Sequence, residues 1–302
     1  MLLYGKPLAE MMEAELRQKV QTYFWAQEKY VAILFFGDNS SSAVYVKHKQ
    51  KYGSKIGLST LIFWQGVDTC PDPKLQVLVS QTKREKNQIL SLIDQLNLDE
   101  KCVGIIVQLP LPPELQNSKN ELLARIHPAK DIDGLGGSLV GKSFFDMIDF
   151  TPATPKAVMS LLDYYELGNV RGKQVAVIGQ STIVGKPLTL ELLKRGALVG
   201  IFDIHNTPEE IKTFCQSSDY IFSATGQMEL IDDSYLNDSK QQILIDIWYG
   251  HKGWKPVGDV NFDAVKDKIL HITPVPWGIG PLTIASLFSN VFVLWEQRAL
   301  LK

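Results

Sequence analysis

An aromatic residue and a lysine share one face of an expected helix near the start of the chain. Tyr45 and Lys49 are four positions apart, the spacing that places two side chains on the same side of a helix. A lysine beside a ligand in a dry site can lose its proton near neutral pH and then act as a general base. Because Lys47, Lys51 and Lys55 accompany it, the spacing alone favours a solvated basic face.

Polar residues that follow an apolar segment are possible partners for this lysine. Gln108 ends the segment GIIVQ, directly before a proline-rich stretch. At the carboxyl end of a parallel strand, such a side chain points toward the place where ligands bind in these sheets. Asp131 and Asp133 lie in KDIDG, where turn formation alone also explains aspartates, since their side chains bond to nearby backbone.

A second candidate site is the loop after the apolar segment QVAVIG, which ends at Gly179. Pro187 follows at the expected start of a helix, a position that tolerates its missing N–H. Free N–H groups at a helix N-terminus favour a phosphate, and Gly185 allows a close approach of the backbone. The spacing is not GxGxxG, so an ordinary tight turn between strand and helix explains the loop as well.

Asp203 strengthens the case for a nucleotide at this loop. It ends the next apolar segment, ALVGIFD, eighteen positions after Gly185. An acid at this place can accept hydrogen bonds from an adenosine ribose, and it would repel a 2′-phosphate. A solvated aspartate at the end of a strand is the alternative interpretation.

The elements that must position these residues alternate between strand and helix. In the first half, strands are expected at residues 30–37, 58–64 and 101–109, and helices at 7–27, about 39–57 and within 71–97. In the second half, the buried strands are expected within 171–179, 197–203, 219–225 and 243–250, with helices after residue 152, at 187–196 and at 282–300. This alternation predicts an α/β fold with parallel sheets.

We expect two domains that flank a cleft. The N-terminal α/β domain is expected to span residues 1–148 and to supply Tyr45, Lys49, Gln108 and Asp133. The C-terminal helix, residues 283–302, is expected to pack back on this domain. Residues 149–282 form a Rossmann-like dinucleotide-binding domain with a parallel sheet.

Composition excludes several other classes of protein. The 302 residues are 45% hydrophobic and 21% charged, and the formal net charge is -2, so neither nucleic acid nor a membrane surface is an expected partner. The apolar runs are too short for a bilayer, and the N-terminus does not resemble a secretory signal. Cys70, Cys102 and Cys215 form no CxxC pair, so no metal site or disulfide framework is expected. We expect a cytoplasmic protein.

Together these segments resemble the methylenetetrahydrofolate dehydrogenase/methenyltetrahydrofolate cyclohydrolase family. The resemblance covers nearly the whole chain and rests on seven motifs in the family's order. They are YVKHKQKYGSKIGL and the segments 108–112, 130–134, 152–155, 179–187, 257–260 and 273–283.

The resemblance implies a bifunctional one-carbon folate enzyme. It would oxidise 5,10-methylenetetrahydrofolate with NADP or NAD and hydrolyse the resulting methenyl cation to 10-formyltetrahydrofolate. By motif, Lys49 would be the central acid/base, Gln108 would hold and tune it, Tyr45 would stack on the folate, and Asp133 would bind the pterin. These four are the expected catalytic residues.

The same resemblance implies further binding residues and an assembly. Substrate contacts are also expected from Pro274, Pro276 and Gly278. Cofactor contacts are expected from Gly179, Gln180, Ser181, Val184, Gly185, Pro187, Asp203, Thr154, Ala224, Thr225, Gly226 and Thr283. A homodimer is expected, through the nucleotide domain, since symmetric pairing is the common state of soluble oligomers.

Several positions depart from the family pattern. Gln180 stands where the family usually has arginine, and Asp203, Ile204 and His205 replace His-Ser-Arg/Lys. Loss of groups that the family uses on a 2′-phosphate leads us to expect a shift toward NAD. Trp277 replaces a glycine beside the expected ligands and could stack on one or block it. Residues 135–137 replace Phe-His-Pro with Leu-Gly-Gly, which is expected to loosen a loop near the pterin.

Three alternatives stay open at this stage. One is a cyclohydrolase with weak or lost dehydrogenase activity, because the changed residues belong to the cofactor site. Another is a non-catalytic folate- or nucleotide-binding paralogue, against which Lys49 and Gln108 argue. A short-chain dehydrogenase also uses Tyr-x-x-x-Lys, but there the glycine-rich loop precedes the Tyr-Lys helix, and here the order is reversed.

Overall fold

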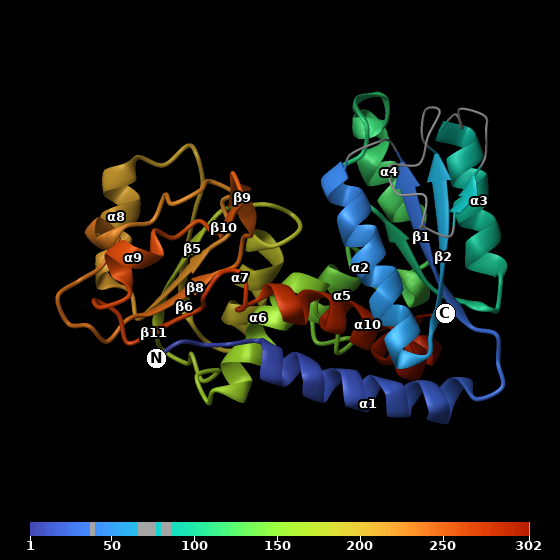
Figure 1. The fold of residues 1–302 in the computed structure, drawn as a ribbon, viewed down its shortest axis with the longest axis horizontal. Helices are drawn as coiled ribbons and strands as arrows, with labels where there is room; N and C mark the ends of the chain where they lie inside the picture. The colour runs from blue at the N-terminus through green and yellow to red at the C-terminus, as the bar shows by residue number, and fades with distance from the viewer. Residues whose placement is uncertain (37–39, 66–76, 80–85, 302) are drawn as a thin grey trace. The chain divides into compact units, whose positions relative to one another are not determined.

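The computed structural model describes residues 1–36, 40–65, 77–79 and 86–301 (Figure 1). Contacts divide the chain into two compact units. We call Met12–Phe150 with Leu287–Lys302 the N-terminal unit, and Met1–Met11 with Thr151–Ser286 the C-terminal unit. Cys70 lies outside the described residues.

The N-terminal unit is built on a parallel sheet with strand order β3-β2-β1-β4. Its strands are β1 (Tyr30–Phe36), β2 (Ser59–Gln65), β3 (Val77–Val79) and β4 (Cys102–Val107). Its helices are α1 (Lys6–Phe24, shared with the other unit), α2 (Ser40–Ile56), α3 (Lys86–Leu98), η1 (Pro113–Ser118), α4 (Lys119–Arg125), η2 (Pro128–Lys130) and α5 (Ser138–Phe144). The parallel pairing of β1 with both β2 and β4 agrees with the sequence prediction.

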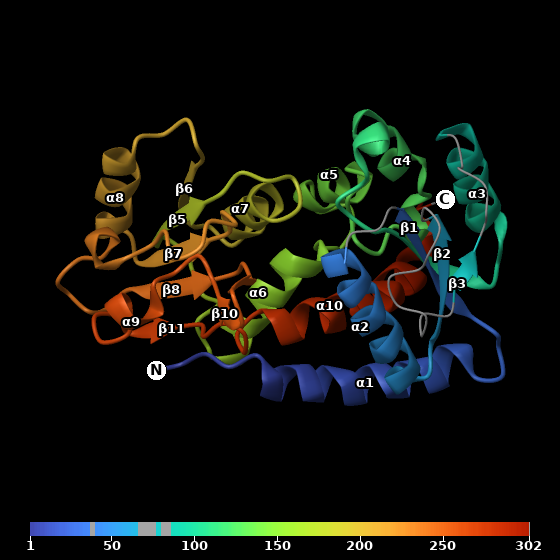
Figure 2. The same ribbon diagram turned by 45° about the horizontal axis from the view of Figure 1, so that its top comes forward.

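Both faces of this sheet are covered, as continuous apolar strands require. One core cluster joins alternate residues of β1, such as Leu34, to Ile93 of α3 and Leu122 of α4. The other residues of β1 point to the opposite face, where α2 and the later part of α10 (Gly280–Gln297) lie (Figure 2). On α10, Phe288 packs on Tyr52 of α2 with ring centroids 5.5 Å apart.

One element was predicted wrongly in this unit. The segment 71–97 has helical periodicity, but Val77–Val79 form β3, which pairs in parallel with β2. Three consecutive apolar residues gain hydrogen bonds on the edge of the sheet, a non-local contact that periodicity cannot reveal. The helix that was expected there begins at Lys86, and the remaining residues of 71–85 lie outside the described ranges.

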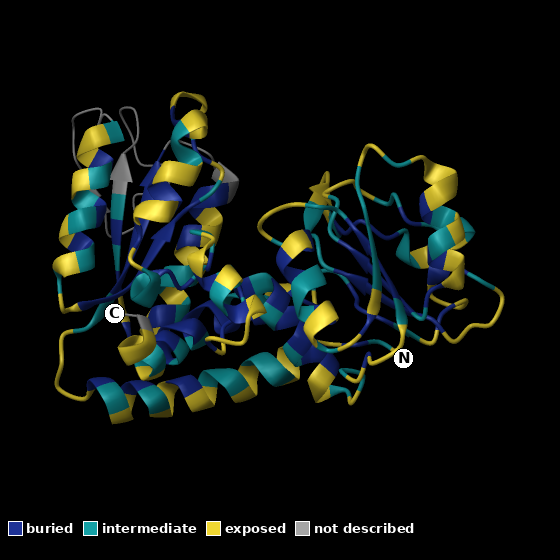
Figure 3. Cartoon of the chain, turned by 180° about the vertical axis from the view of Figure 1, so that it is seen from behind, coloured by how far each residue is buried: buried dark blue, intermediate teal, exposed yellow. Residues whose placement is uncertain are grey.

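The C-terminal unit has a five-stranded parallel sheet with strand order β11-β8-β7-β5-β6. The strands are β5 (Gln174–Ile178), β6 (Leu198–Phe202), β7 (Tyr220–Ser223), β8 (Ile243–Asp246) and β11 (His271–Ile272), and a separate hairpin has β9 (Gly250–Lys252) and β10 (Lys255–Val257). The helices are α6 (Ala153–Tyr164), α7 (Gly185–Lys194), α8 (Pro208–Ser217), η3 (Asp233–Tyr235) and α9 (Phe262–Val265), and η4 (Arg298–Leu301) ends the described chain in the other unit. Figure 3 shows the buried strands inside each unit and the exposed outer sides of the helices.

The expected strand 243–250 is shorter than predicted, because β8 ends at Asp246. There the Asp246 carboxylate accepts hydrogen bonds from the backbone of Asp259 and Val260, and the chain leaves the sheet to form the hairpin. At the edge strand beside β8, Leu3 donates to Ile272 of β11 at 2.8 Å. This contact explains why the first residues of the chain group with the C-terminal unit.

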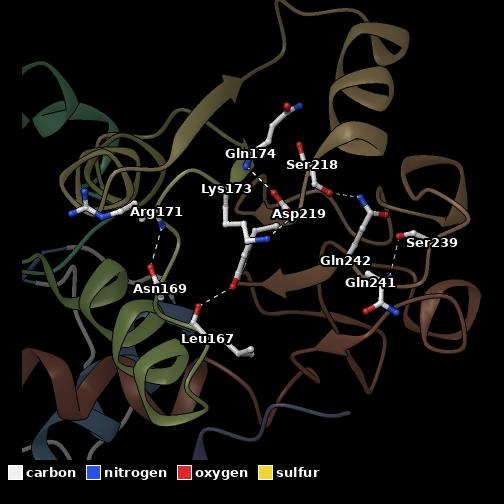
Figure 4. A network of polar contacts seen from close by, with 11 residues as sticks. Leu167, Asn169, Arg171, Lys173, Gln174, Ser218, Asp219, Ser239, Gln241 and Gln242 are labelled. Carbon is white, nitrogen blue, oxygen red and sulfur yellow. Dashed lines mark hydrogen bonds and ion pairs between the residues drawn. The ribbon is translucent and has the colours of Figure 1, made fainter.

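Polar contacts close the amino ends of the strands in this sheet (Figure 4). The Asp219 carboxylate accepts a bond from the backbone N–H of Gln174 at 2.9 Å and one from the Lys173 amine at 3.2 Å. Gln242 donates to the Ser218 carbonyl at 2.8 Å. These side chains satisfy backbone groups and each other, so the loops at the carboxyl ends of the strands are the better candidates for ligands.

No helix within the described ranges combines the length and apolarity needed to span a membrane.

Candidate active site and nucleotide loop

The structure brings Lys49 and Gln108 into direct contact in the N-terminal unit. Lys49 is on α2, and its Nζ donates to Oε1 of Gln108 at 3.0 Å. Gln108 directly follows β4, and its backbone N–H donates to the Leu34 carbonyl, which extends the pairing with β1. The Gln108 side chain is buried, and its Nε2 donates to the Leu109 carbonyl at 2.7 Å. Because that bond fixes the amide nitrogen, the amide oxygen faces the lysine.

The surroundings of Lys49 favour a neutral amine. Burial lowers the pKa of Lys49 below its usual value, and the carboxylate of Asp133 opposes that shift. The residue as a whole is only partly buried. A neutral amine carries a lone pair that can accept a proton, which an ammonium cannot do. This arrangement supports acid/base chemistry and argues against a solvated basic face for this one lysine.

The two aspartates of KDIDG have different surroundings. Asp131 is buried, and its carboxylate accepts bonds from the backbone N–H groups of Gly134, Leu135 and Gly136. Burial raises the pKa of Asp131 to about 6. Asp133 is less buried and acts electrostatically on Lys49. Turn formation therefore accounts for Asp131, whereas Asp133 belongs to the group around the lysine.

Tyr45 stands one helical turn before Lys49 with 45% of its surface exposed. An exposed aromatic ring beside a desolvated amine provides a flat apolar surface for a ligand ring. The N-terminal unit thus assembles all four residues expected to be catalytic, on α2, after β4 and in the turn before α5.

The predicted phosphate loop of the C-terminal unit is tightly wound. Gly179 has φ +112°, and a Cβ there would lie 2.4 Å from the Ala224 carbonyl oxygen. A Cβ on Gly185, where α7 begins, would lie 1.7 Å from the Gly179 carbonyl oxygen. Ser181 accepts a bond from the Val184 N–H at 3.1 Å, and Pro187 is buried in the first turn. Two glycines are therefore needed by the backbone itself at this helix N-terminus.

We predict that Gly185→Ala weakens dinucleotide binding about tenfold and lowers Tm, because the added Cβ must displace the loop backbone. Isothermal titration with NAD and NADP and a thermal melt would measure both effects. Gly141→Ala is the matched control, since a Cβ there meets no atom within 4 Å in the described structure. Unchanged affinity in a folded Gly185→Ala protein would contradict a role of this loop in binding.

Asp203 lies just after β6 and takes part in a small local network. Its backbone N–H donates to Oδ1 of Asn206 at 3.0 Å, and its own Oδ1 accepts from the His205 N–H at 2.9 Å. Gln180 donates to the Ile201 carbonyl at 3.4 Å, and Ile204 is exposed. Sequence reasoning missed Asn206, which shapes this turn. Its position within an Asp-x-x-Asn turn was the available signal.

Two buried acids hold the loop after β7: Asp246, which sequence reasoning missed, and Asp259, which lies in the motif 257–260 but was given no role. Asp259 accepts bonds from the Thr225 N–H at 2.6 Å and from the Ser223 hydroxyl at 2.9 Å. Asp246 holds the backbone of Asp259, and burial raises the pKa of Asp246 to about 8. Hydrogen bonds to these buried acids therefore fix the loop that contains the predicted contact residues Ala224, Thr225 and Gly226. A polar residue at the end of the buried segment ILID was the sequence signal.

The remaining predicted residues also lie in the C-terminal unit. Thr154 is in the first turn of α6, and Thr283 is in the first turn of α10. Pro274 and Gly278 are buried, Pro276 is partly buried, and Trp277 is 56% exposed. Within the described residues, no group of three or more His, Cys, Asp or Glu side chains could hold a metal ion.

These observations define a class of protein: a two-unit α/β protein with a Rossmann-like sheet in one unit and a desolvated lysine in the other. Comparison with known families makes the assignment specific. Residues 3–133 match the tetrahydrofolate dehydrogenase/cyclohydrolase catalytic domain, and residues 152–299 match the NAD(P)-binding domain of the same family. The chain belongs to the tetrahydrofolate dehydrogenase/cyclohydrolase family.

Similar proteins span the whole chain. The bifunctional protein FolD of Thermodesulfovibrio yellowstonii is 37% identical over 100% of this chain and 99% of its own length. FolD of Lactobacillus acidophilus is 35% identical over 98% of both. The crystal structure of the Campylobacter jejuni FolD dehydrogenase/cyclohydrolase covers 99% of each chain at 33% identity, with a TM-score of 0.86.

The structure of the Trypanosoma brucei enzyme with NADP and an inhibitor covers 99% of this chain and 98% of its own, at 26% identity and a TM-score of 0.84. The family resemblance and the α/β fold with a Rossmann-like NAD(P)-binding unit are thus confirmed. The chain is an enzyme with dehydrogenase/cyclohydrolase function that uses a nicotinamide dinucleotide.

Proposed function

We propose that Lys49 is the acid/base of the cyclohydrolase reaction, in which 5,10-methenyltetrahydrofolate becomes 10-formyltetrahydrofolate. The observation that carries this proposal is the desolvated Lys49 amine held at 3.0 Å by the Gln108 oxygen. A neutral amine is repelled less by the cationic methenyl group than an ammonium would be. Tyr45 would stack on the folate, and Asp133 would bind the pterin.

The proton balance gives Lys49 two tasks. Water forms a bond to the methenyl carbon while the amine takes one proton from that water. The resulting ammonium then protonates N5 as the bond between N5 and this carbon breaks, which leaves the formyl group on N10. The second proton of the water goes to solvent. Gln108 accepts a hydrogen bond from the amine throughout and so keeps its lone pair directed at the substrate.

The dehydrogenase reaction depends mainly on the alignment of the folate ring with the nicotinamide ring. Bound NAD(P)⁺ would accept a hydride from the methylene carbon of 5,10-methylenetetrahydrofolate. The tight turn at Gly179 and Gly185 fits a diphosphate, because it brings the N-terminus of α7, with its free backbone N–H groups, to the carboxyl end of β5. The loop at Thr225, supported by Asp259, would hold the nicotinamide end.

We infer that NAD is preferred over NADP. Asp203 would accept bonds from the ribose and repel a 2′-phosphate, and Gln180 offers no positive charge to that phosphate. We also propose functional boundaries after residues 148 and 282, a homodimer and a cytoplasmic location, as expected from sequence. The oligomeric state is measurable by light scattering.

The test of the function is an assay of both reactions with the purified protein. We expect reduced nicotinamide to appear with methylenetetrahydrofolate and the absorbance of methenyltetrahydrofolate to decay faster than in buffer. The changed residues of the cofactor site, Gln180 and Asp203, support a second candidate, a cyclohydrolase with weak or lost dehydrogenase activity. Methenyl decay without reduced nicotinamide would support that candidate, and absence of both activities would indicate a binding paralogue.

A further inference from the structure

The turn that carries Asp133 is held firmly at its start. Lys130 donates from Nζ to the carbonyl oxygens of Leu96 at 2.7 Å and Asp99 at 2.8 Å, at the C-terminal end of α3. The next residue, Asp131, forms a parallel bridge with Ile105 of β4. Both contacts fix the turn to the sheet and to one covering helix of the N-terminal unit.

The following residue, Ile132, is anchored through both its side chain and its backbone. The side chain is completely buried against Gly104, where a Cβ would come within 2.9 Å of its carbon atoms. Its carbonyl oxygen accepts a bond from Nδ2 of Asn290 at 3.0 Å. Asn290 lies on α10, is completely buried, and is 158 positions away in sequence.

Asp133 directly follows this anchor, and its carboxylate is the charged group that acts on the Lys49 amine. The amine itself donates to the neutral amide of Gln108, and Tyr45 shares its helix face. A shift of the Ile132 carbonyl would therefore be passed on to Asp133 over a single residue. The position of one carboxylate near the reactive amine depends on an amide from the C-terminal helix.

We propose that Asn290 is a positioning residue for the cyclohydrolase reaction, holding the KDID turn from α10 so that the Asp133 carboxylate stays where it acts on Lys49. This proposal rests on the proposed role of Lys49. Asn290 acts through the backbone of Ile132, to which its amide donates. Its loss should therefore resemble a change at Asp133.

The experiment compares Asn290→Ala with Asp133→Asn in the full-length protein. We expect kcat of Asn290→Ala to fall about tenfold to a hundredfold, because small misplacements of a reacting group cost rates of that size. We also expect the rising limb of the pH–rate profile to move to lower pH. The sign follows because Asp133 raises the pKa of Lys49, so a displaced or missing carboxylate lets that pKa fall further.

A double-mutant cycle separates positioning from general damage. If Asn290 acts through Asp133, Asn290→Ala moves the pH profile little further in the Asp133→Asn background. Ser286→Ala is the matched control, because Ser286 is buried on the same helix and its hydroxyl makes no hydrogen bond in the described structure. Asn290→Gln keeps the amide and should restore part of the rate.

Two results would overturn the inference. One is a folded Asn290→Ala protein whose pH–rate profile does not move. The other is a double variant whose pH–rate profile shifts by the full sum of the two single-variant shifts. If Asn290→Ala does not fold, Asn290→Ser tests the same bond, since its side chain is too short to reach the carbonyl. Full activity of Lys49→Met would instead overturn the proposed function, so the two failures are distinguishable.

Discussion

Replacement of Lys49 by methionine is expected to lower the cyclohydrolase rate by about 10²- to 10⁴-fold, the usual contribution of a positioned acid/base. Methionine keeps most of the side-chain length and removes the amine that faces Gln108. The substitution also removes a desolvated ionisable group, so the fold should be retained. Dehydrogenase activity should fall less, because hydride transfer depends mainly on ring alignment.

Initial rates of methenyltetrahydrofolate decay, measured across pH, would check this expectation. Lys51→Met is the matched control, because Lys51 is exposed on the same helix two positions later. A Lys49→Met protein with the wild-type cyclohydrolase rate would rule out the mechanism, whatever the effect on dehydrogenase activity. In the wild-type protein the lowered pKa of Lys49 should let the rate rise at a lower pH than an ordinary lysine would allow.

The strands that carry the site were predictable because each is a continuous apolar run. β1, β4 and β5 are buried on both faces, so their sequences contain little else than apolar residues. The ends of these strands then locate Gln108 and Gly179 without further information. The same reasoning failed at β3, where Val77–Val79 owe their state to pairing with β2 rather than to their own periodicity.

Residues that act through distant contacts could not be predicted from a single sequence. Asn290 meets Ile132 across 158 positions, and Asp259 meets Ser223 across 36. Nothing in the types or the spacing of these residues indicates their partners. Lys49 is a second case in which the sequence is not enough. The neighbouring lysines suggest a solvated face, and only the contact with Gln108 in the folded protein distinguishes Lys49 from those lysines.

Asp203→Ser combined with Gln180→Arg is expected to move the preference from NAD toward NADP by about 10²- to 10⁴-fold in kcat/KM. Two interactions that involve a charge are changed, and each is worth about 1.5–3 kcal/mol. The first change removes a carboxylate that would repel a 2′-phosphate. The second supplies a guanidinium, which binds phosphate through paired donors. Gln180 makes one weak bond at 3.4 Å to the Ile201 carbonyl, so its replacement disturbs little.

Dehydrogenase rates with NAD and with NADP, for each single variant and the double variant, would resolve the two contributions. Asp238→Ser is the charge-matched control, because Asp238 is an exposed acid of the same unit. The NAD rate of Asp203→Ser should fall through loss of the ribose contact, and the NADP rate should rise as the repulsion disappears. A wild-type protein that strongly prefers NADP, or a double variant with unchanged preference, would show that the 2′-phosphate does not meet these residues.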